Sequence, residues 1–199
     1  ATEFGCSVAI SGNYAIVGAV GDDDKGSASG SAYIFNVQTG ARLHKLIANS
    51  DGAAGDNFGC SVAISGNYAI VGAKMDDDNG TNSGSAYIFN VQTGAQLHKL
   101  TASDGYDDDR FGSSVAIDGN YAIVGALYND DHGTSSGSAY IFNVQTGAER
   151  YKLLPMDARI ATEFGCSVAI SGNYAIVGAR YEDEPPRNNA ISNYGSAYI

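Results

Sequence analysis

The feature that most constrains this chain is a sixteen-residue stretch that occurs four times. FGCSVAISGNYAIVGA begins at Phe4, and near-identical copies begin at Phe58, Phe111 and Phe164, 53 or 54 residues apart. A period near 50 is typical of propeller blades or solenoid coils, because each repeat is one supersecondary unit that buries its apolar faces only against its neighbours. The sequence therefore predicts a repeat architecture.

Each period contains four short segments with the composition of β-strands. In the first copy they are FGCSVAI (4–10), YAIVGA (14–19), GSAYIF (30–35) and the more polar ARLHKL (41–46). The turns SGN and NVQTG join the first to the second segment and the third to the fourth, and both are typical of tight hairpins. Two antiparallel hairpins per repeat favour a propeller over a β-solenoid, and fourfold repetition argues against a β-sandwich. We predict an all-β propeller region over 1–199, with four-stranded blades of about 53 residues near 1–50, 51–103, 104–156 and 157–199.

The sequence leaves the number of blades in the closed ring open. The fourth copy stops inside its third segment at Ile199, so we expect fifteen strands and an incomplete last blade. Four blades fit a part of a larger ring, half of an assembly of two chains or a piece of a longer repeat array. A closed four-blade monomer would leave an open edge, so we expect a larger ring or assembly.

The repeat resembles a known family. FG at the start of the first segment, VGA at the end of the second and GSAYIF in the third are similar to the FG-GAP repeat of integrin α-subunit propellers and their bacterial and fungal relatives. Many members of that family carry a calcium loop of the form DxDxDGxxD between the first two strands. Here that loop is only Ser-Gly-Asn, too short to supply the six to eight oxygens that calcium requires. The usual metal site of the family is therefore not expected here.

The composition excludes some partners. The chain has 22 acids, 11 Lys and Arg, and a formal net charge of −11. Nucleic-acid binding needs a basic surface, so we expect no nucleic-acid partner. No run of eighteen apolar residues occurs, so we expect no membrane insertion. Cations, sugars and basic proteins remain possible partners.

The three cysteines share one repeat position. They are Cys6, Cys60 and Cys166, and Ser113 takes their place in the third copy. A disulfide framework usually has an even number of cysteines, and spacings above fifty residues match no zinc pattern. We predict that these cysteines are small buried core residues.

The acids gather on one predicted side of the disk. Alternating hairpins bring the loops between second and third strands together with the connections between blades, and these segments form what we call the acidic face. It contains every acid except Asp118 and Glu149. One interpretation is that these acids are solvated and keep the protein soluble. Another is that they attract a basic partner. The third is a cation site, possible because clustered carboxylates repel one another unless a cation lies between them. The candidate calcium ligands are Asp22, Asp24, Asp76, Asp78, Asp130 and Asp131.

Four tyrosines break the repeat pattern and lie on the acidic face. Most aromatic residues occupy fixed repeat positions and are expected in the core. Five tyrosines are exceptions. Tyr151 lies in the fourth segment of its repeat, and the four on the acidic face, which we predict as candidate ligand-binding residues, are Tyr106, Tyr128, Tyr181 and Tyr194. Asn79-Gly80-Thr81 is a candidate glycosylation acceptor in a loop.

No catalytic grouping emerges from the sequence, so we expect no enzyme. The leading hypothesis is an extracellular or cell-surface adhesion module that binds a protein or glycan ligand through the acidic face. The resemblance leaves a propeller-type lectin as one alternative, since some fungal relatives resemble sugar binders. The near-identical copies leave a structural repeat of a surface or filament assembly as another.

Overall fold

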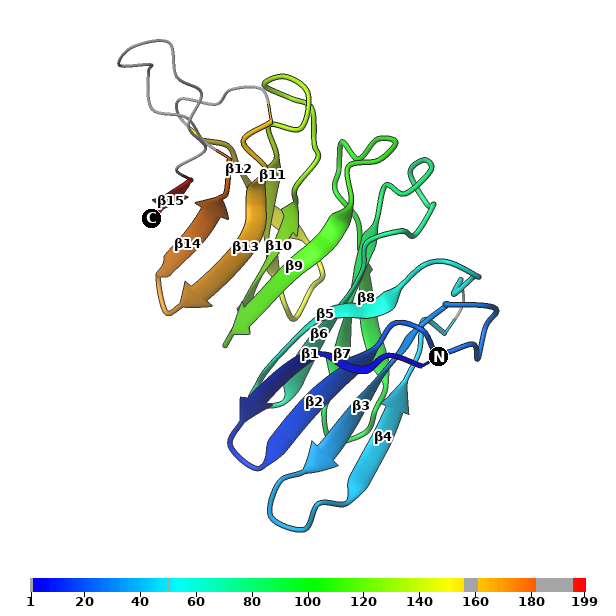
Figure 1. The fold of residues 1–199 in the computed structure, drawn as a ribbon. Helices are drawn as coiled ribbons and strands as arrows, with labels where there is room; N and C mark the ends of the chain where they lie inside the picture. Colours follow the sequence, from blue (N-terminus) through cyan, green and yellow to red (C-terminus); the bar gives the residue numbers. More distant parts are fainter. Residues whose placement is uncertain (1, 50, 156–160, 182–194) are drawn as a thin grey trace.

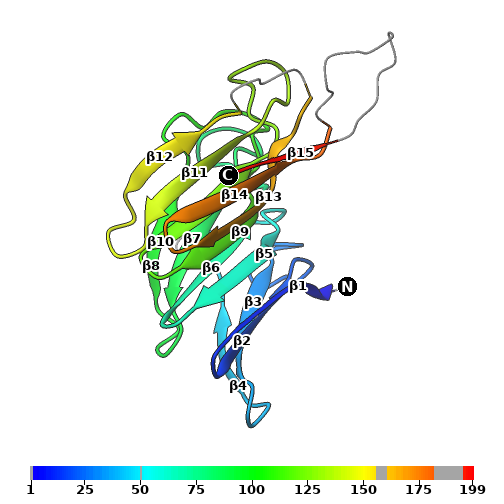
Figure 2. The same ribbon diagram turned by 90° about the vertical axis from the view of Figure 1, so that its left-hand side faces the viewer.

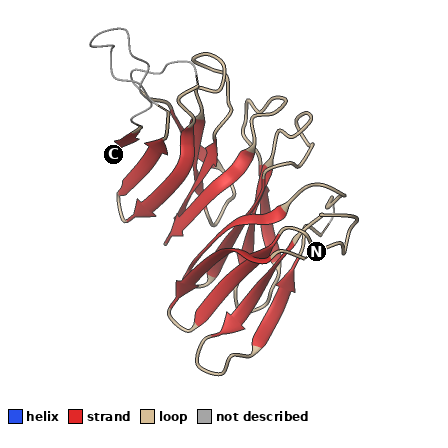
Figure 3. Cartoon of the chain, viewed as in Figure 1, coloured by secondary structure: helices blue, strands red, loops and turns tan. Residues whose placement is uncertain are grey.

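The computed structural model describes residues 2–49, 51–155, 161–181 and 195–199. These residues form fifteen β-strands in four antiparallel sheets, and Figure 3 shows no helix among them. Within the described part of the chain, no helix is long and apolar enough to cross a membrane. The predicted propeller blades are confirmed.

Each sheet is one blade, and its strands pair in chain order. Blade 1 contains β1 (Phe4–Ser11), β2 (Tyr14–Ala19), β3 (Ser31–Asn36) and β4 (Arg42–Leu46). Blade 2 contains β5 (Phe58–Ser65), β6 (Tyr68–Ala73), β7 (Ser85–Asn90) and β8 (Gln96–Leu100). Blade 3 contains β9 (Phe111–Asp118), β10 (Tyr121–Ala126), β11 (Ser138–Asn143) and β12 (Glu149–Leu153). Blade 4 contains β13 (Phe164–Ser171), β14 (Tyr174–Ala179) and β15 (Ser196–Tyr198).

The first strands of the blades lie next to one another and are the inner strands. β1 contacts β5, β5 contacts β9, and β9 contacts β13, which Figure 2 shows as neighbouring ribbons. The outer strands β4, β8 and β12 each pair with only one strand. The small residues of the first strands allow this close approach.

The hydrophobic core lies between the blades. One cluster joins Ile16 and Ile34 of blade 1 to Phe58, Val62 and Ile64 of blade 2. The same repeat positions form a second cluster between blades 2 and 3 and a third between blades 3 and 4. Each sequence copy is therefore repeated because each blade buries its apolar face against the next.

Close packing between blades explains why glycine follows phenylalanine at the start of each first strand. Gly59 has a φ of 94°, and its first strand has a register shift between Phe58 and Ser61. A Cβ at Gly59 would lie 2.4 Å from the carbonyl oxygen of Ser31 in the preceding blade. Only glycine combines this backbone conformation with so close an approach.

The prediction of buried core cysteines is wrong for Cys6, which is exposed, while Cys60 and Cys166 are half-buried. Cys6 is exposed because β1 has no blade on its other side in this structure. All three thiols are free, and each donates to a glycine carbonyl, as Cys166 does to Gly178 at 3.4 Å. Ser113 makes the equivalent bond to Gly125 at 3.1 Å, which explains why serine and cysteine exchange at this position.

Candidate functional site

The predicted acidic face forms because the loop after each second strand binds the connection to the next blade. Between blades 1 and 2, the amides of Gly55, Asn57 and Phe58 donate to the carbonyls of residues 27–29. The same pattern recurs at the next two junctions. These loops project from one end of the blades in Figure 1. Hydrogen bonds between loops therefore hold the acidic face in place.

The first position of the acidic loop lies beneath the surface in blades 1 to 3, and it is occupied by Asp22, Asp76 and, in blade 3, Asn129. Asp22 accepts hydrogen bonds from the Ser31 hydroxyl at 2.9 Å and the Tyr33 hydroxyl at 2.7 Å. Asp76 makes the same contacts with Ser85 and Tyr87, both at 2.9 Å. These buried carboxylates link their loops to the third strand of the same blade.

The second position of the loop is an acid in blades 1 to 3, and it is exposed and orders the loop. Asp23, Asp77 and Asp130 each accept a hydrogen bond from the amide five residues later, at 2.7–2.8 Å. An asparagine at these positions retains an oxygen that accepts the same bond. The charge can therefore be removed without losing the loop geometry.

The third position of the loop is an acid that pairs with a lysine of the outer strand in blades 1 to 3. Lys45 pairs with Asp22 at 3.0 Å and with Asp24. Lys152 pairs with Asp131 and with Asp104, which belongs to the connection before its blade. Blades 1 to 3 each supply an internal cation to their own acidic loop.

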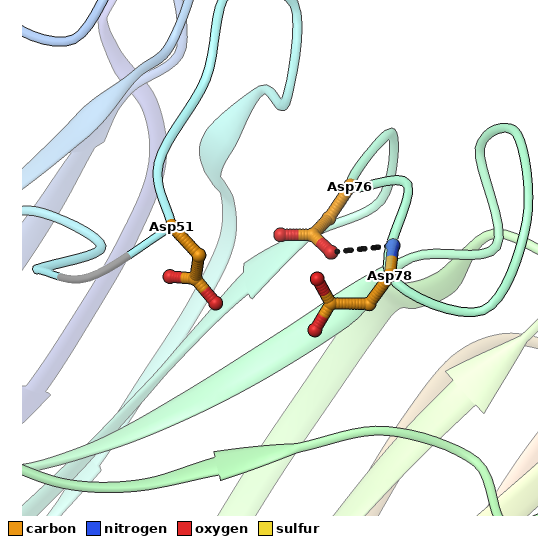
Figure 4. A group of neighbouring side chains, drawn as sticks. All are labelled: Asp51, Asp76 and Asp78. Atoms are coloured by element: carbon orange, nitrogen blue, oxygen red, sulfur yellow. Dashed lines mark hydrogen bonds between the residues drawn. The ribbon is translucent and has the colours of Figure 1, made fainter.

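Blade 2 has the fullest of these clusters. The Lys99 ammonium pairs with Asp51, Asp78 and Asp76, the last at 3.2 Å. It also lies 5.3 Å from the centre of the Tyr87 ring. Figure 4 shows the three carboxylates turned toward one another, with the Asp78 amide donating to Asp76 at 3.2 Å.

Sequence reasoning missed these lysines. Lys45, Lys99 and Lys152 lie in the more polar fourth segment of their repeats, where basic residues are typical of an outer strand in water and discourage strand-to-strand aggregation. The available signal was their recurrence at one repeat position in each described outer strand. Register explains the difference, because Lys99 is the cross-strand partner of Tyr87, whose hydroxyl points into the acidic loop.

The candidate metal ligands are only partly brought together. Asp51, Asp76 and Asp78 offer oxygens within 4.8 Å of one another, a donor set that suits a cation. The cation bonded to all three here is the Lys99 ammonium, which a calcium ion at the same point would have to displace. Asp130 instead bonds its own loop. Calcium binding therefore stays a prediction.

The candidate tyrosines are scattered over the acidic face. Tyr106 is 72% exposed, whereas Tyr128 and Tyr181 lie beside guanidinium groups. Arg110 lies 4.7 Å from the Tyr128 ring centre, and Arg180 lies 4.9 Å from that of Tyr181. Tyr194 lies outside the described residues. Their ligand role stays a prediction.

The glycosylation candidate is exposed in the loop of blade 2. The Asn79 side-chain nitrogen donates to the Ala102 carbonyl at 3.2 Å. A glycan at this nitrogen would have to break that bond. Glycosylation of Asn79 stays a prediction.

Sequence reasoning also missed an aromatic groove on the opposite side of the blades. It has a volume of about 270 Å³, and its lining includes Tyr121, Tyr151 and Tyr174. At the earlier junctions, the residues equivalent to Tyr151 are His44 and His98, which bond carbonyls of the next blade's hairpin loop. The groove therefore occupies the place where an adjacent hairpin loop lies at the other junctions.

Burial and hydrogen bonds alter the pKa values of the buried carboxyls on the acidic face. Burial opposes the charged form of Asp22, but bonds from Tyr33, Lys45 and Ser31 outweigh it and lower its pKa to about 2. Burial raises the pKa of Asp56 to about 6, helped by the charges of the nearby loop and opposed by an amide bond from Ala53. Asp56 is thus a buried carboxyl whose charge opposes folding at neutral pH.

Asp56→Asn is expected to stabilise the protein at pH 7 by about 1–3 kcal/mol, since one pKa unit corresponds to about 1.4 kcal/mol. The unfolded carboxyl ionises near pH 4 and the folded one near pH 6, so wild-type stability from this group falls as pH rises between these values. The gain should nearly vanish at pH 4, as urea unfolding at both pH values would measure. Glu3→Gln, which removes an exposed charge of the same face, is the control. An equal gain at both pH values would contradict the account.

Comparisons with known proteins agree with this geometry. The family model described as FG-GAP repeat matches residues 2–35, 42–89, 95–142 and 148–199. A search of curated proteins finds no match.

Two computationally designed proteins share the fold. Ika4 is 17% identical with a TM-score of 0.58, and the match covers 88% of this chain and 84% of Ika4. Ika8 is 16% identical with a TM-score of 0.56, and the match covers 87% of this chain and 42% of Ika8. At such identities the likeness concerns the fold alone.

Proposed function

The chain belongs to the FG-GAP repeat family, and from that premise we propose that it is a non-enzymatic, extracellular binding module that recognises a basic protein partner through the acidic face. The observation that carries the proposal is the charge left on this face after the internal lysines are paired. The exposed acids of its described part that no internal lysine pairs with are Glu3, Asp23, Asp77, Asp107, Asp108 and Asp130. Among the described residues of the same loops, the exposed bases are Lys25 and Arg180.

The loop structure supports recognition rather than simple solvation. Acids that only keep a protein soluble need no fixed position, whereas these are held by bonds to backbone amides and to the next blade. A fixed array of one charge sign attracts an opposite array and lowers the ordering cost of binding. A partner with several lysines or arginines fits this chemistry.

A lectin is the second candidate, and the observation in its favour is Tyr106. Its ring is 72% exposed among acids, including the neighbouring Asp107 and Asp108. An exposed aromatic ring beside carboxylates suits a sugar ring. The candidate is weaker because Tyr128 and Tyr181 already lie against arginines.

Parallel binding measurements distinguish the two candidates. The protein would be tested against immobilised poly-lysine and against a glycan array, each with calcium and with EDTA. We expect poly-lysine binding that weakens as salt rises, because a Debye length of about 10 Å at 0.1 M shortens further with salt. Repeated glycan hits without poly-lysine binding would replace the proposal with the lectin, and loss of those hits in EDTA would implicate a cation. Binding to neither would overturn both candidates.

A further inference from the structure

The apolar packing between two blades recurs at each junction of the described chain. The front side of each junction is the first strand of the later blade, with Phe58, Val62 and Ile64 buried at 1%, 7% and 7% exposure. The rear side belongs to the earlier blade and includes Ile16, which is fully buried. The junction between blades 2 and 3 repeats this packing with the equivalent residues.

The same front surface is uncovered on blade 1. Phe4, Val8 and Ile10 are 55%, 67% and 70% exposed, although they occupy the positions of Phe58, Val62 and Ile64. We call these three residues, with Gly5, the front face. Burying this many apolar atoms is worth several kcal/mol, because each large side chain contributes about 1.5–3 kcal/mol. Exposed apolar surface of this kind marks an interaction site.

The matching rear surface is uncovered on blade 4. Ile176 is 41% exposed, whereas its counterparts Ile16, Ile70 and Ile123 are fully buried. A hollow of about 210 Å³ lies beside it and is lined by Ser167, Val168, Ala169, Ile176, Gly178 and Ala197. We call this hollow the rear face.

We propose that the front face of one copy binds the rear face of a second copy, reproducing the junction that the blades make within the chain. The occupant follows from identity of sequence, since residues 1–19 and 161–179 are identical. The rear face of blade 4 therefore meets the same front surface that blade 3 meets on blade 4 itself. This inference is independent of the proposed function.

Polar contacts at the internal junctions define what the second copy must supply. Ser61 donates to the Gly112 carbonyl at 2.8 Å, and Ser114 donates to the Gly165 carbonyl at 2.7 Å. Across the new junction, Ser167 of one copy donates in the same way to the Gly5 carbonyl of the other. The second copy would therefore bury the exposed apolar side chains of both faces and would also supply a hydrogen-bond donor to the Gly5 carbonyl.

The two faces differ, so the association is head-to-tail. A heterologous junction closes into a ring if its rotation permits and otherwise continues as a filament. Either outcome retains the front-to-rear junction. A two-fold contact, in which two identical faces meet, would not form the front-to-rear junction.

Complementation of single-face variants tests the proposal. Ile10→Asp removes the front face, and Ile176→Asp removes the rear face. Native mass spectrometry and sedimentation should show assemblies of the wild-type chain and monomers of each variant alone. An equal mixture should form a one-to-one dimer and nothing larger, because it retains one intact junction.

Two further variants keep the result interpretable. Leu43→Asp changes an outer-strand residue that is 41% exposed, and it should leave the assembly unchanged. Gly178→Ala places a methyl group in the rear face and should abolish association while circular dichroism and melting show an intact fold. A monomeric wild-type chain, a mixture that stays monomeric, or a single-face variant that still associates would each overturn the proposal.

Discussion

Gly72→Ala is expected to lower the free energy of unfolding by about 3 kcal/mol or more, at the upper end of overpacking effects. A Cβ at Gly72 would lie 2.0 Å from the carbonyl oxygen of Gly112 in the next blade and 2.3 Å from the Ser61 hydroxyl. The serine can rotate away, but the carbonyl belongs to an inner strand and cannot move without separating two blades. At about 2–4 °C per kcal/mol for a chain of this size, the melting temperature should fall by about 6–12 °C.

Gly178→Ala is the matched control for this effect. Gly178 occupies the same repeat position, and its Cβ would meet the Ser167 hydroxyl at 2.4 Å but no backbone atom nearer than 3.7 Å. The loss should stay below about 1 kcal/mol. Both variants would be melted in the Ile10→Asp background, so that association does not contribute to stability. Equal losses would show that the methyl group clashes within its own blade rather than with the next one.

Lys99→Met is expected to destabilise the protein by about 2–4 kcal/mol at pH 7, because removal of one partner leaves buried charges uncompensated. The Lys99 side chain is only 17% exposed, and Asp76 is 3% exposed beneath it. Lys45→Met should cost less, since Lys45 is 30% exposed and pairs with two carboxylates instead of three. Urea unfolding of the two variants measures the difference.

The direction of the pKa shift of Lys99 determines the pH range over which this lysine stabilises the protein. Bonds to Asp51, Asp78 and Asp76 raise the pKa of Lys99 despite its burial. The stabilisation is therefore complete below the unfolded value of about 10.4 and is lost as pH rises through the folded value. Lys99→Met should approach wild-type stability only in strong alkali. A loss equal to that of Lys45→Met would contradict the role given to Asp51.

The same variant tests the calcium prediction. Without the ammonium, the oxygens of Asp51, Asp76 and Asp78 lie close enough to share one cation. Calcium that raises the melting temperature of Lys99→Met but not of the wild type would mean that lysine normally takes the place of the ion. If calcium stabilises the wild type and Asp76→Asn with Asp78→Asn removes the effect, the ion binds beside the lysine. No effect in either protein would remove the calcium prediction.

The fold could be predicted from local patterns because each blade is built from short hairpins. Turns such as Gly12-Asn13 and the alternation of Phe4, Cys6, Val8 and Ile10 determine strand positions without long-range information. The side of the disk that carries the acids follows from strand alternation alone. These features repeat in all four copies.

The chemistry of the acidic face could not be predicted in the same way. Whether Asp78 meets a metal, water or a lysine depends on the register of β7 and β8, which places Lys99 opposite Tyr87. The exposure of Cys6 likewise depends on a neighbouring blade rather than on its own strand.

The most direct test of the central claim compares charge removal on and off the acidic face. Asp77→Asn with Asp130→Asn removes two exposed charges while keeping the loop hydrogen bonds, and Asp118→Asn with Glu149→Gln removes the two acids that lie elsewhere. Binding of each variant to immobilised poly-lysine would be measured at low salt. We expect on the order of five-fold weaker binding for the first variant, mainly through slower association, and unchanged binding for the second. Equal losses would mean that net charge rather than the acidic face determines binding, and the central claim would be wrong.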